Sequence, residues 1–383
     1  MNGDERPKKK WRRLIGIVFS LVSLAVLTYI AVSLISGQSL DISWISDLFN
    51  PGASVVMADE YQFDVGRGRV FADLGGSLAA AGTLGIQVLD AGGRETLRDS
   101  FRMANPAISA LNGRAIAFDI GGTSVRVFSD TEIVASIDAG GSIIASSINR
   151  NGWFNVCTQE GGGSRGKVTV YNDKGRNVYK VDLVSGYVLS AVLSPDNRSL
   201  AVLNLTDDGS RVTYYNLSNE NTDRVLNIPG ALLIDMRYLP GGDVLAVSTD
   251  SLILAGRNNV GRELYGFSGR RLGGYTYGSG FIALHLLDYG VGYRGRLVTL
   301  SESGALLGEI ETDMEIISIS AGDGFLAVLR SDKLVFYNEA LEVLPPSGDF
   351  VTATGPAKVL ALGGSMALVA GDHSAVVVAA GAA

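Results

Sequence analysis

The stretch SLAVLN (199–204) is a short apolar run of a kind that recurs along the chain, and this recurrence decides the fold. Seven other runs share its character: SLAAAG (77–82), AIAFDI (115–120), WFNVCT (153–158), VLAVST (244–249), FIALHL (281–286), FLAVLR (325–330) and MALVAG (366–371). Measured between the second residues of successive runs, the spacing is 37 to 46 residues. The sequence therefore consists of eight units of about forty residues.

Each unit contains the same order of strand-like pieces. A polar turn such as LSPDNRS (193–199) precedes the apolar run, and a third strand such as KVTVYN (167–172) follows it. A further turn then leads to a fourth strand such as RNVYKVDL (176–183). Four antiparallel strands in a unit of this length are typical of a β-propeller blade. We therefore predict an all-β protein, an eight-bladed β-propeller, with seven blades as the alternative.

The last unit suggests how the ring closes. It offers only three strand-like pieces, AKVLAL (357–362), SMALVAG (365–371) and SAVVVA (374–379). The segment SVVMADEYQFD (54–64) precedes the first full unit and has no partner of its own. We expect this segment to supply the outer strand of the eighth blade, because pairing both chain ends in one sheet leaves no long open edge.

The N-terminus reads as a membrane anchor. Residues 14–35 are 22 consecutive uncharged, mostly apolar positions. As a helix they would reach about 33 Å, enough to cross a bilayer core. The basic run KKKWRR (8–13) precedes them, and the positive-inside rule keeps such a tail in the cytoplasm. A cleaved signal peptide is the alternative, but the apolar run is longer than a usual signal h-region.

Four segments follow from this interpretation. Residues 1–13 are a cytoplasmic basic tail, 14–35 a transmembrane helix, 36–53 a juxtamembrane linker and 54–383 an extracytoplasmic propeller. Within the linker, DISWISDLFN (41–50) places its apolar side chains on one helical face, which is compatible with an interfacial helix. We expect a single-pass protein of the cytoplasmic membrane with its propeller outside.

The net charge of the chain limits the classes of partner that we expect it to bind. Residues 1–13 hold six basic and two acidic side chains, which leaves 26 basic and 37 acidic residues for the rest of the chain, a net charge of −11. Nucleic-acid binding depends on lysines and arginines that displace counterions from phosphate, so an acidic exported domain is a poor nucleic-acid binder. The partners we expect are the lipid bilayer, through residues 14–35, and an envelope protein or glycan.

Residues for metal or cofactor chemistry are scarce. The chain has only two histidines, His285 and His373, and one cysteine, Cys157, each within an apolar run. We expect all three to be structural, with no metal site, no cofactor and no catalytic residue to name.

Two runs, GGGSRG (161–166) and GVGYRG (290–295), match the spacing G-x-G-x-x-G of dinucleotide-binding folds. That motif works only between a strand and a helix N-terminus. Here each run is followed by an alternating strand pattern, KVTVYN (167–172) or RLVTLS (296–301). We interpret both runs as hairpin loops between strands, in which glycine supplies the positive φ angles.

Binding residues in a propeller concentrate on loops held by the rigid scaffold. The two glycine runs and TDDGSR (206–211) are expected to be elongated loops between second and third strands, on one face of the ring. Candidate basic residues there are Arg165, Lys167, Arg211, Arg294 and Arg296. The alternative is that arginine only keeps these hairpins soluble.

Three tyrosines, Tyr187, Tyr275 and Tyr277, lie near the expected starts of first strands. We expect them to rim the central channel on the same face as the basic loops. Such rings could stack on a sugar or anchor a peptide, while packing between blades is the alternative.

The joint SPDNRSLAV (194–202) resembles the strand connection of WD40 and periplasmic translocation-protein propellers. The whole arrangement of basic tail, single span and glycine-rich propeller resembles an uncharacterised bacterial family of membrane-anchored propellers. The chain departs from quinone-cofactor propellers, which carry a repeated tryptophan motif. The resemblance implies a propeller fold and a membrane anchor and assigns no functional residue.

Two functions follow. The first is a non-enzymatic scaffold or receptor that binds an envelope protein or glycan. The alternative is a hydrolase or lyase acting on cell-wall or extracellular polysaccharide, with acidic residues at the channel mouth. Carboxylate pairs in a propeller come from different blades, so spacing along the sequence cannot reveal them.

Overall fold

The second strand of each unit is buried on both faces, as its continuous apolar sequence predicts. Every residue of β3 (Leu78–Gly82) and of β19 (Val244–Ser248) is buried. The fourth strands β5 (Glu95–Ser100) and β13 (Asn177–Asp182) instead alternate exposed and partly buried positions. A strand with two buried faces needs a neighbouring sheet on each side. The blades before and after it in the ring are those two sheets.

The computed structural model describes residues 57–159, 165–219, 222–256, 260–290, 292–344, 358–371 and 374–380. The predicted tail (1–13), membrane helix (14–35) and linker (36–53) lie outside these residues. Within the described ranges, no helix has the length and apolar character needed to cross a membrane.

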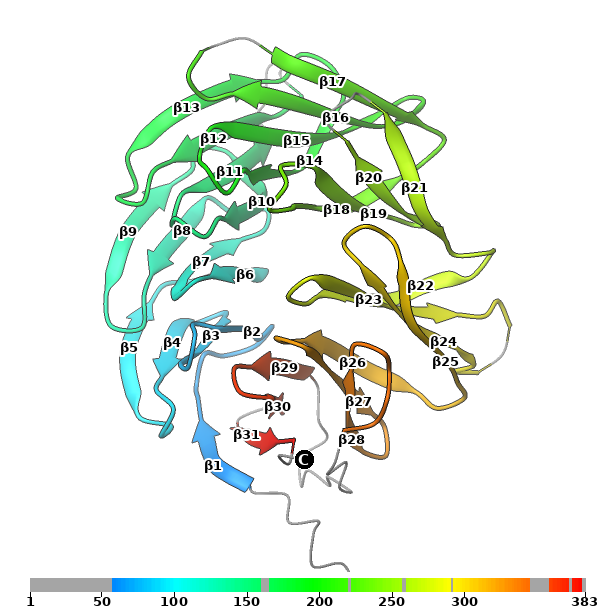
Figure 1. Cartoon of the computed structure of the whole chain (residues 1–383). Coiled ribbons are helices and arrows are strands. Elements are labelled where there is room, and N and C mark those ends of the chain that lie inside the picture. Colours follow the sequence, from blue (N-terminus) through cyan, green and yellow to red (C-terminus); the bar gives the residue numbers. More distant parts are fainter. Residues whose placement is uncertain are drawn as a thin grey trace, which may run out of the picture. The chain divides into compact units, whose positions relative to one another are not determined.

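The strands are seen in order around the ring in Figure 1. Their bounds are β1 (Met57–Gln62), β2 (Val70–Asp73), β3 (Leu78–Gly82), β4 (Gly85–Leu89), β5 (Glu95–Ser100), β6 (Pro106–Leu111), β7 (Arg114–Asp119), β8 (Ser124–Phe128), β9 (Ile133–Asp138), β10 (Ser142–Ile148), β11 (Phe154–Gln159), β12 (Lys167–Tyr171), β13 (Asn177–Asp182), β14 (Tyr187–Leu193), β15 (Ser199–Thr206), β16 (Gly209–Asn216), β17 (Thr222–Pro229), β18 (Leu233–Tyr238), β19 (Val244–Ser248), β20 (Ser251–Ala255), β21 (Gly261–Gly266), β22 (Arg271–Tyr277), β23 (Phe281–Leu287), β24 (Gly295–Ser301), β25 (Leu306–Thr312), β26 (Ile316–Ala321), β27 (Phe325–Arg330), β28 (Leu334–Asn338), β29 (Lys358–Leu362), β30 (Met366–Ala370) and β31 (Ser374–Ala379).

These strands form eight antiparallel sheets in the described part of the chain. Blades one to six are consecutive groups of four strands, from β2–β5 to β22–β25. Blade seven has β26, β27 and β28, with one further bridge between Tyr337 and Val343. Blade eight has the order β1-β31-β30-β29. The predicted eight-bladed propeller is confirmed, and the seven-bladed alternative is wrong.

The predicted closure of the ring is also confirmed. Strand β1, from the start of the described chain, pairs antiparallel with β31 at its end, with Tyr61 opposite Ala375 and Gln62 opposite Ser374. It forms the outer strand of blade eight, as the unpaired segment at 54–64 predicts. The first strands surround the centre in Figure 1, and fourth strands such as β9, β13 and β25 lie at the rim.

The core is divided between the blades rather than held in one place. Eight apolar clusters are present among the described residues, and each one joins residues of two neighbouring blades. The cluster between blades eight and one contains Phe63, Phe71 and Leu368. The rings of Phe63 and Phe71 meet edge to face, with centroids 5.1 Å apart. Apolar packing is therefore continuous around the ring, across the point where the chain ends meet.

First strands of blades three to seven share a local irregularity. The register shifts by one residue between Val188 and Ser190 in β14 and between Leu233 and Asp235 in β18. The same shift occurs in β10, β22 and β26. A β-bulge of this kind turns a side chain toward a direction that regular pleating would not allow. In blades four and five the extra residues, Leu189 and Ile234, line the central cavity.

Replacing Phe63 with alanine tests the closure. Phe63 is buried between the first and last blades, so we expect Phe63→Ala to lower the free energy of unfolding by about 3 kcal/mol. Urea unfolding of the full chain measures this. The control Val184→Ala removes a side chain that is 87% exposed and should change little. A Phe63→Ala protein as stable as the parent would contradict a closed ring.

Candidate functional site

The propeller has two different faces. On the loop face lie the connections between blades and the loops that join second to third strands, such as the loop between β15 and β16. On the turn face lie the turns that join first to second and third to fourth strands, such as the turn between β14 and β15. The central channel runs from the loop face to the turn face. A residue at the start of a first strand therefore lies near the loop face, and a residue at its end lies near the turn face.

On the loop face, three of the predicted residues come together between blades three and four. Arg165, Tyr187 and Arg211 line one cavity of about 520 Å³. The Arg165 guanidinium lies over the Tyr187 ring, 5.0 Å from its centroid. Tyr187 begins β14 and remains 50% exposed, so part of its ring is open to a ligand. A cation stacked on a tyrosine gives a planar, partly apolar surface with hydrogen-bond donors at its edge.

The same cavity holds groups of both charge signs. Arg211 donates from Nε to Asn227 Oδ1 (2.8 Å) and from a terminal nitrogen to Ser185 Oγ (3.3 Å). Asp207 and Asp208 line the cavity from the turn between β15 and β16. These contacts fix the Arg211 side chain before any ligand arrives, which reduces the entropy lost on binding.

The TDDGSR segment (206–211) is not an elongated loop, and that prediction is wrong. Strands β15 and β16 pair out to Thr206 and Gly209, so only Asp207 and Asp208 form the turn. The strands themselves are longer here. Gly209 has a φ of +140°, a conformation that glycine adopts readily.

The remaining basic candidates do not join this cavity. Lys167 lies on β12 with its Nζ 3.6 Å from Asp182, and Arg296 on β24 forms ion pairs with Glu309 and Glu311 of β25. Arg294 belongs to blade six, is 73% exposed and lies 3.8 Å from Asp288. One continuous basic surface is therefore not formed. The structure brings together Arg165 and Arg211, and places the other three elsewhere.

Both glycine runs connect antiparallel strands, as predicted. The first lies between β11 and β12 and the second between β23 and β24, so neither has the strand-to-helix context of a phosphate loop. Gly166 shows why glycine is needed. A Cβ there would lie 2.4 Å from Val188 Cγ1 in the next blade.

Two of the predicted tyrosines occupy the opposite end of their strand. Tyr275 and Tyr277 are at the end of β22, toward the turn face, whereas Tyr187 is at the start of β14. The expectation that all three rim one face is therefore wrong. A register count could not place them, because the sequence does not show where β22 begins. Tyr277 nevertheless lines the channel, and Tyr275 lines a smaller cavity beside His285.

The channel cavity has a volume of about 820 Å³ and contains residues that the sequence analysis missed. Asp235, Arg237 and Tyr238 reach it from β18, and Ser190 reaches it from β14. Glu302 lines it from the turn between β24 and β25. These residues belong to three different blades, four, five and six, so spacing along the chain gave no sign that they share a cavity.

Asp235 is the most perturbed acid of this cavity. Burial raises the pKa of its carboxyl group, and this effect exceeds the opposing influence of the Met236 N–H, the two nearby tyrosines and Arg237. The Arg237 guanidinium lies over the Tyr277 ring, 5.3 Å from the ring centroid. Burial, and next the charge of Asp235, raise the pKa of the Tyr277 hydroxyl. Asp235, Arg237 and Tyr277 thus act on one another electrostatically in the channel wall.

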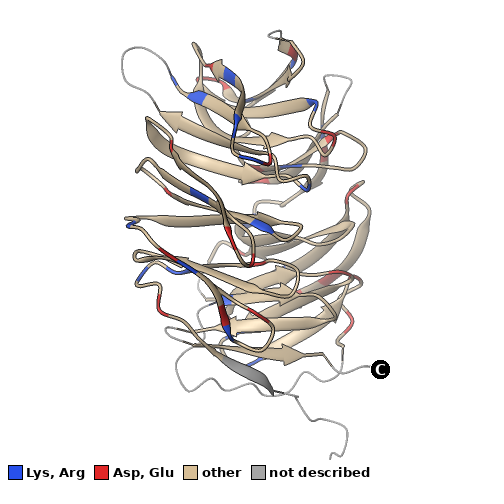
Figure 2. Cartoon of the chain, turned by 90° about the vertical axis from the view of Figure 1, so that its left-hand side faces the viewer, with Lys and Arg blue, Asp and Glu red and all other residues tan. Residues whose placement is uncertain are grey.

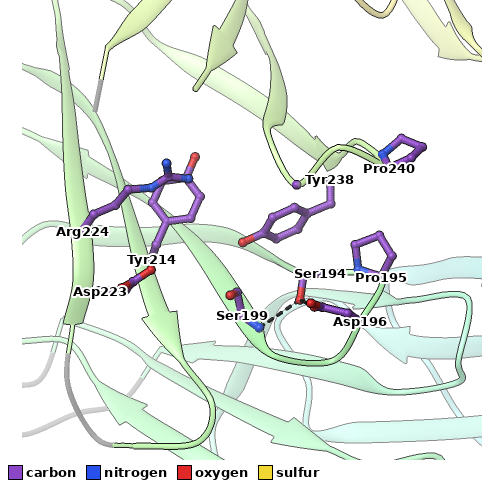
Figure 3. Close-up of a pocket in the computed structure, with 10 residues that line it drawn as sticks. Ser194, Pro195, Asp196, Ser199, Tyr214, Asp223, Arg224, Tyr238 and Pro240 are labelled. Carbon is purple, nitrogen blue, oxygen red and sulfur yellow. Dashed lines mark hydrogen bonds between the residues drawn. The ribbon is translucent and has the colours of Figure 1, made fainter. Parts of the chain in front are cut away.

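A groove on the turn face lies between blades four and five (Figure 3). Tyr238, Pro195 and Pro240 line both the groove and the channel cavity. Deeper in the groove, the Arg224 guanidinium covers the Tyr214 ring at 3.6 Å and donates to Gly256 O (2.9 Å). The groove has a volume of about 510 Å³ and is separated from the channel cavity by the three residues that line both.

Charged residues are interspersed on the surface. On the side viewed in Figure 2, basic and acidic positions alternate over several blades and do not separate into areas of one sign. This side of the molecule therefore shows no area of a single charge sign.

Cys157 lies on β11 and His285 on β23, both strands with apolar sequences, and His373 lies outside the described residues. Cys157 and His285 are both buried, and burial raises the pKa of the Cys157 thiol, which makes it a poor nucleophile. Burial lowers the pKa of His285 to about 4, and Arg271 contributes to the shift. Groups of three or more potential metal ligands do not occur in the described ranges.

The geometry defines a β-propeller with ligand-sized cavities on its loop face and in its channel. The chain belongs to the family described as a family of unknown function (DUF5711), whose model matches residues 53–340.

Among solved structures, the C-terminal WD40 domain of Sif2 is similar at 12% identity and a TM-score of 0.61, covering 86% of this chain and 99% of that one. The β-propeller domain of Cps50 (Swd1) from Myceliophteria thermophila matches at 8% identity and a TM-score of 0.47, covering 84% and 98%. No curated protein matches the sequence. At such identities the Sif2 likeness shows the fold alone.

The buried histidine predicts a pH-dependent stability. Its pKa is about 4 in the folded protein and 6.5 ordinarily, so between these values the unfolded chain binds a proton that the folded chain excludes. Stability is therefore highest above pH 6.5 and falls as the pH drops toward 4, by roughly 3 kcal/mol from this group.

Urea unfolding at several pH values measures the effect, with His285→Leu as the comparison. Carboxyl groups titrate in both proteins, so the difference between the two profiles isolates His285. Parallel profiles between pH 6.5 and 4 would contradict a buried neutral imidazole.

Proposed function

We propose that this protein is a non-enzymatic scaffold or receptor that binds an envelope protein or glycan through its loop face. The observation that carries the proposal is the cavity between blades three and four, where Arg165 stacks on a half-exposed Tyr187 and Arg211 is held beside them. Tyrosine and arginine, together with tryptophan, are enriched among the residues that contribute most to binding. A propeller scaffold supports this role because it holds such loops rigidly.

The location we propose is the outer side of the cytoplasmic membrane. The support is the uncharged run at 14–35 preceded by the basic run at 8–13, which together favour a single span with the N-terminus in the cytoplasm. The propeller begins shortly after the span, so its partners would lie close to the membrane surface.

A triple variant tests the loop-face site. We expect Arg165→Ala, Tyr187→Ala and Arg211→Ala together to reduce binding about tenfold or more, because they remove the stacked pair and its neighbouring donor. Affinity capture from envelope extracts and a glycan array, both with the full chain, measure this. The matched control is Arg294→Ala, which removes an exposed arginine of blade six. If the triple variant keeps every bound protein and glycan, the loop face is not the binding site.

The membrane topology has its own test. We expect the full chain to sediment with membranes and resist extraction by high salt, and a chain lacking residues 14–35 to lose this behaviour. A protease added outside intact spheroplasts should degrade the propeller. Protection of the propeller until the membrane is broken would overturn the proposed orientation.

A further inference from the structure

The loop-face cavity between blades three and four carries charged groups of both signs. Arg165 comes from the loop between β11 and β12, and Asp207 and Asp208 form the turn between β15 and β16. All three are exposed. In the described part of the chain, no ion pair joins either aspartate to Arg165 or Arg211. Charges of both signs therefore face one cavity, where a ligand can pair with them.

Apolar surface lies in the same cavity. Val184, in the connection between blades three and four, is 87% exposed, and Tyr187 keeps half of its ring accessible. Pro229 lines the cavity from the end of β17. The side chains of an exposed valine and proline cannot form hydrogen bonds with water, so covering them with an apolar group is favourable. A ligand that covers this surface must bring an apolar group as well as charges.

Strand register gives the order of these groups along the edge of blade four. Tyr187 lies opposite Leu205, and Gly209 lies opposite Pro229, so the acidic turn stands between Tyr187 and Pro229. Arg165 covers the Tyr187 ring from blade three. The surface is therefore basic, then aromatic, then acidic, and it continues to the proline of the fourth strand.

Backbone hydrogen bonds hold both charged segments in place. Arg165 N donates to Leu183 O (3.0 Å), and Leu183 N donates to Gly166 O (2.8 Å). On the other side of the cavity, Gly230 N donates to Asp208 O (2.7 Å). The backbone that carries the charges is ordered before a ligand binds, so less conformational entropy is lost on binding.

A polypeptide segment supplies all three kinds of group. It can carry a carboxylate for Arg165, an apolar side chain for Val184 and Tyr187, and a cationic group for the acidic turn. A neutral saccharide leaves the charges without an ionic partner, and an acidic saccharide brings a further negative charge beside Asp207 and Asp208. The cavity volume of about 520 Å³ lies within the range of ligand sites, so the segment must be short.

We propose that the loop-face cavity binds a short segment of a partner protein in which an apolar side chain lies between an acidic and a basic residue. The acidic residue pairs with Arg165, and the basic residue pairs with Asp207 and Asp208. The apolar side chain covers Val184 and the open part of the Tyr187 ring. This inference rests on the proposed function, because it names the partner of the same site as a protein rather than a glycan.

The test presents the full chain, in detergent, with a displayed library of random heptapeptides. We expect the enriched peptides to share an aromatic or aliphatic residue with an acidic residue on one side and a basic residue on the other. Calorimetry then measures the strongest of them as a synthetic peptide. Replacing its apolar residue with alanine should weaken binding about tenfold. Replacing either charged residue with glutamine should weaken binding about threefold.

Coupled substitutions locate each charge. In an Arg165→Gln protein, exchanging the acidic residue of the peptide for glutamine should have no further effect, because its ionic partner is absent. In a protein with Asp207→Asn and Asp208→Asn, the same should hold for the basic residue of the peptide. The control Asp313→Asn changes an exposed aspartate in the connection between β25 and β26 and should leave both peptide effects at about threefold.

Three outcomes would overturn the inference. The first is a library from which no peptide is enriched. The second is peptide binding that survives the triple variant at Arg165, Tyr187 and Arg211. The third is a peptide whose charge substitutions keep their full effect in the Arg165 and Asp207/Asp208 variants.

The glycan array separates failure of the inference from failure of the proposed function. If no peptide binds but a glycan does, and the triple variant abolishes that binding, the inference fails and the proposed function stands. If neither peptide nor glycan nor captured envelope protein depends on the three residues of the triple variant, both fail.

Discussion

The need to cover both faces of every second strand governs this protein. Strands such as β3 and β19 are buried along their whole length, so a single sheet exposes too much apolar surface to stand alone. Radial stacking covers the apolar faces of the blades by packing each blade against its two neighbours. The first and last blades have both faces covered only if they pack against each other. Phe63, Phe71 and Leu368 make that contact, so the apolar packing has no end.

Ring closure also determines where chemistry can occur. Because eight first strands face one axis, side chains from several blades share the channel although they are about forty residues apart in sequence. The β-bulges of blades three to seven add a second effect. In β14 and β18 they turn Leu189 and Ile234 into the channel. The same scaffold holds Arg165 and Tyr187 in contact across the junction of blades three and four.

The candidate site was only partly visible in the sequence. Arg165, Tyr187 and Arg211 were identifiable because they lie in or beside the loops between strands, where a propeller presents its binding residues. Arg296 and Lys167 were candidates by the same reasoning, but their side chains pair with carboxylates of the adjacent fourth strand. Pairing of this kind depends on cross-strand register, which the sequence does not specify to the residue.

The sequence by itself predicted the repeated antiparallel units, eight blades with seven as the alternative, and the pairing of the two chain ends in one sheet, because continuous apolar runs recur about every forty residues and need a neighbouring sheet on each face. Tertiary structure alone decided that Asp235, Arg237, Ser190 and Tyr277 line one cavity. Each of these residues belongs to a strand of ordinary composition, and their proximity arises from the curvature of the ring. Such proximity between blades leaves no local pattern in the chain, since no single strand contains the whole site.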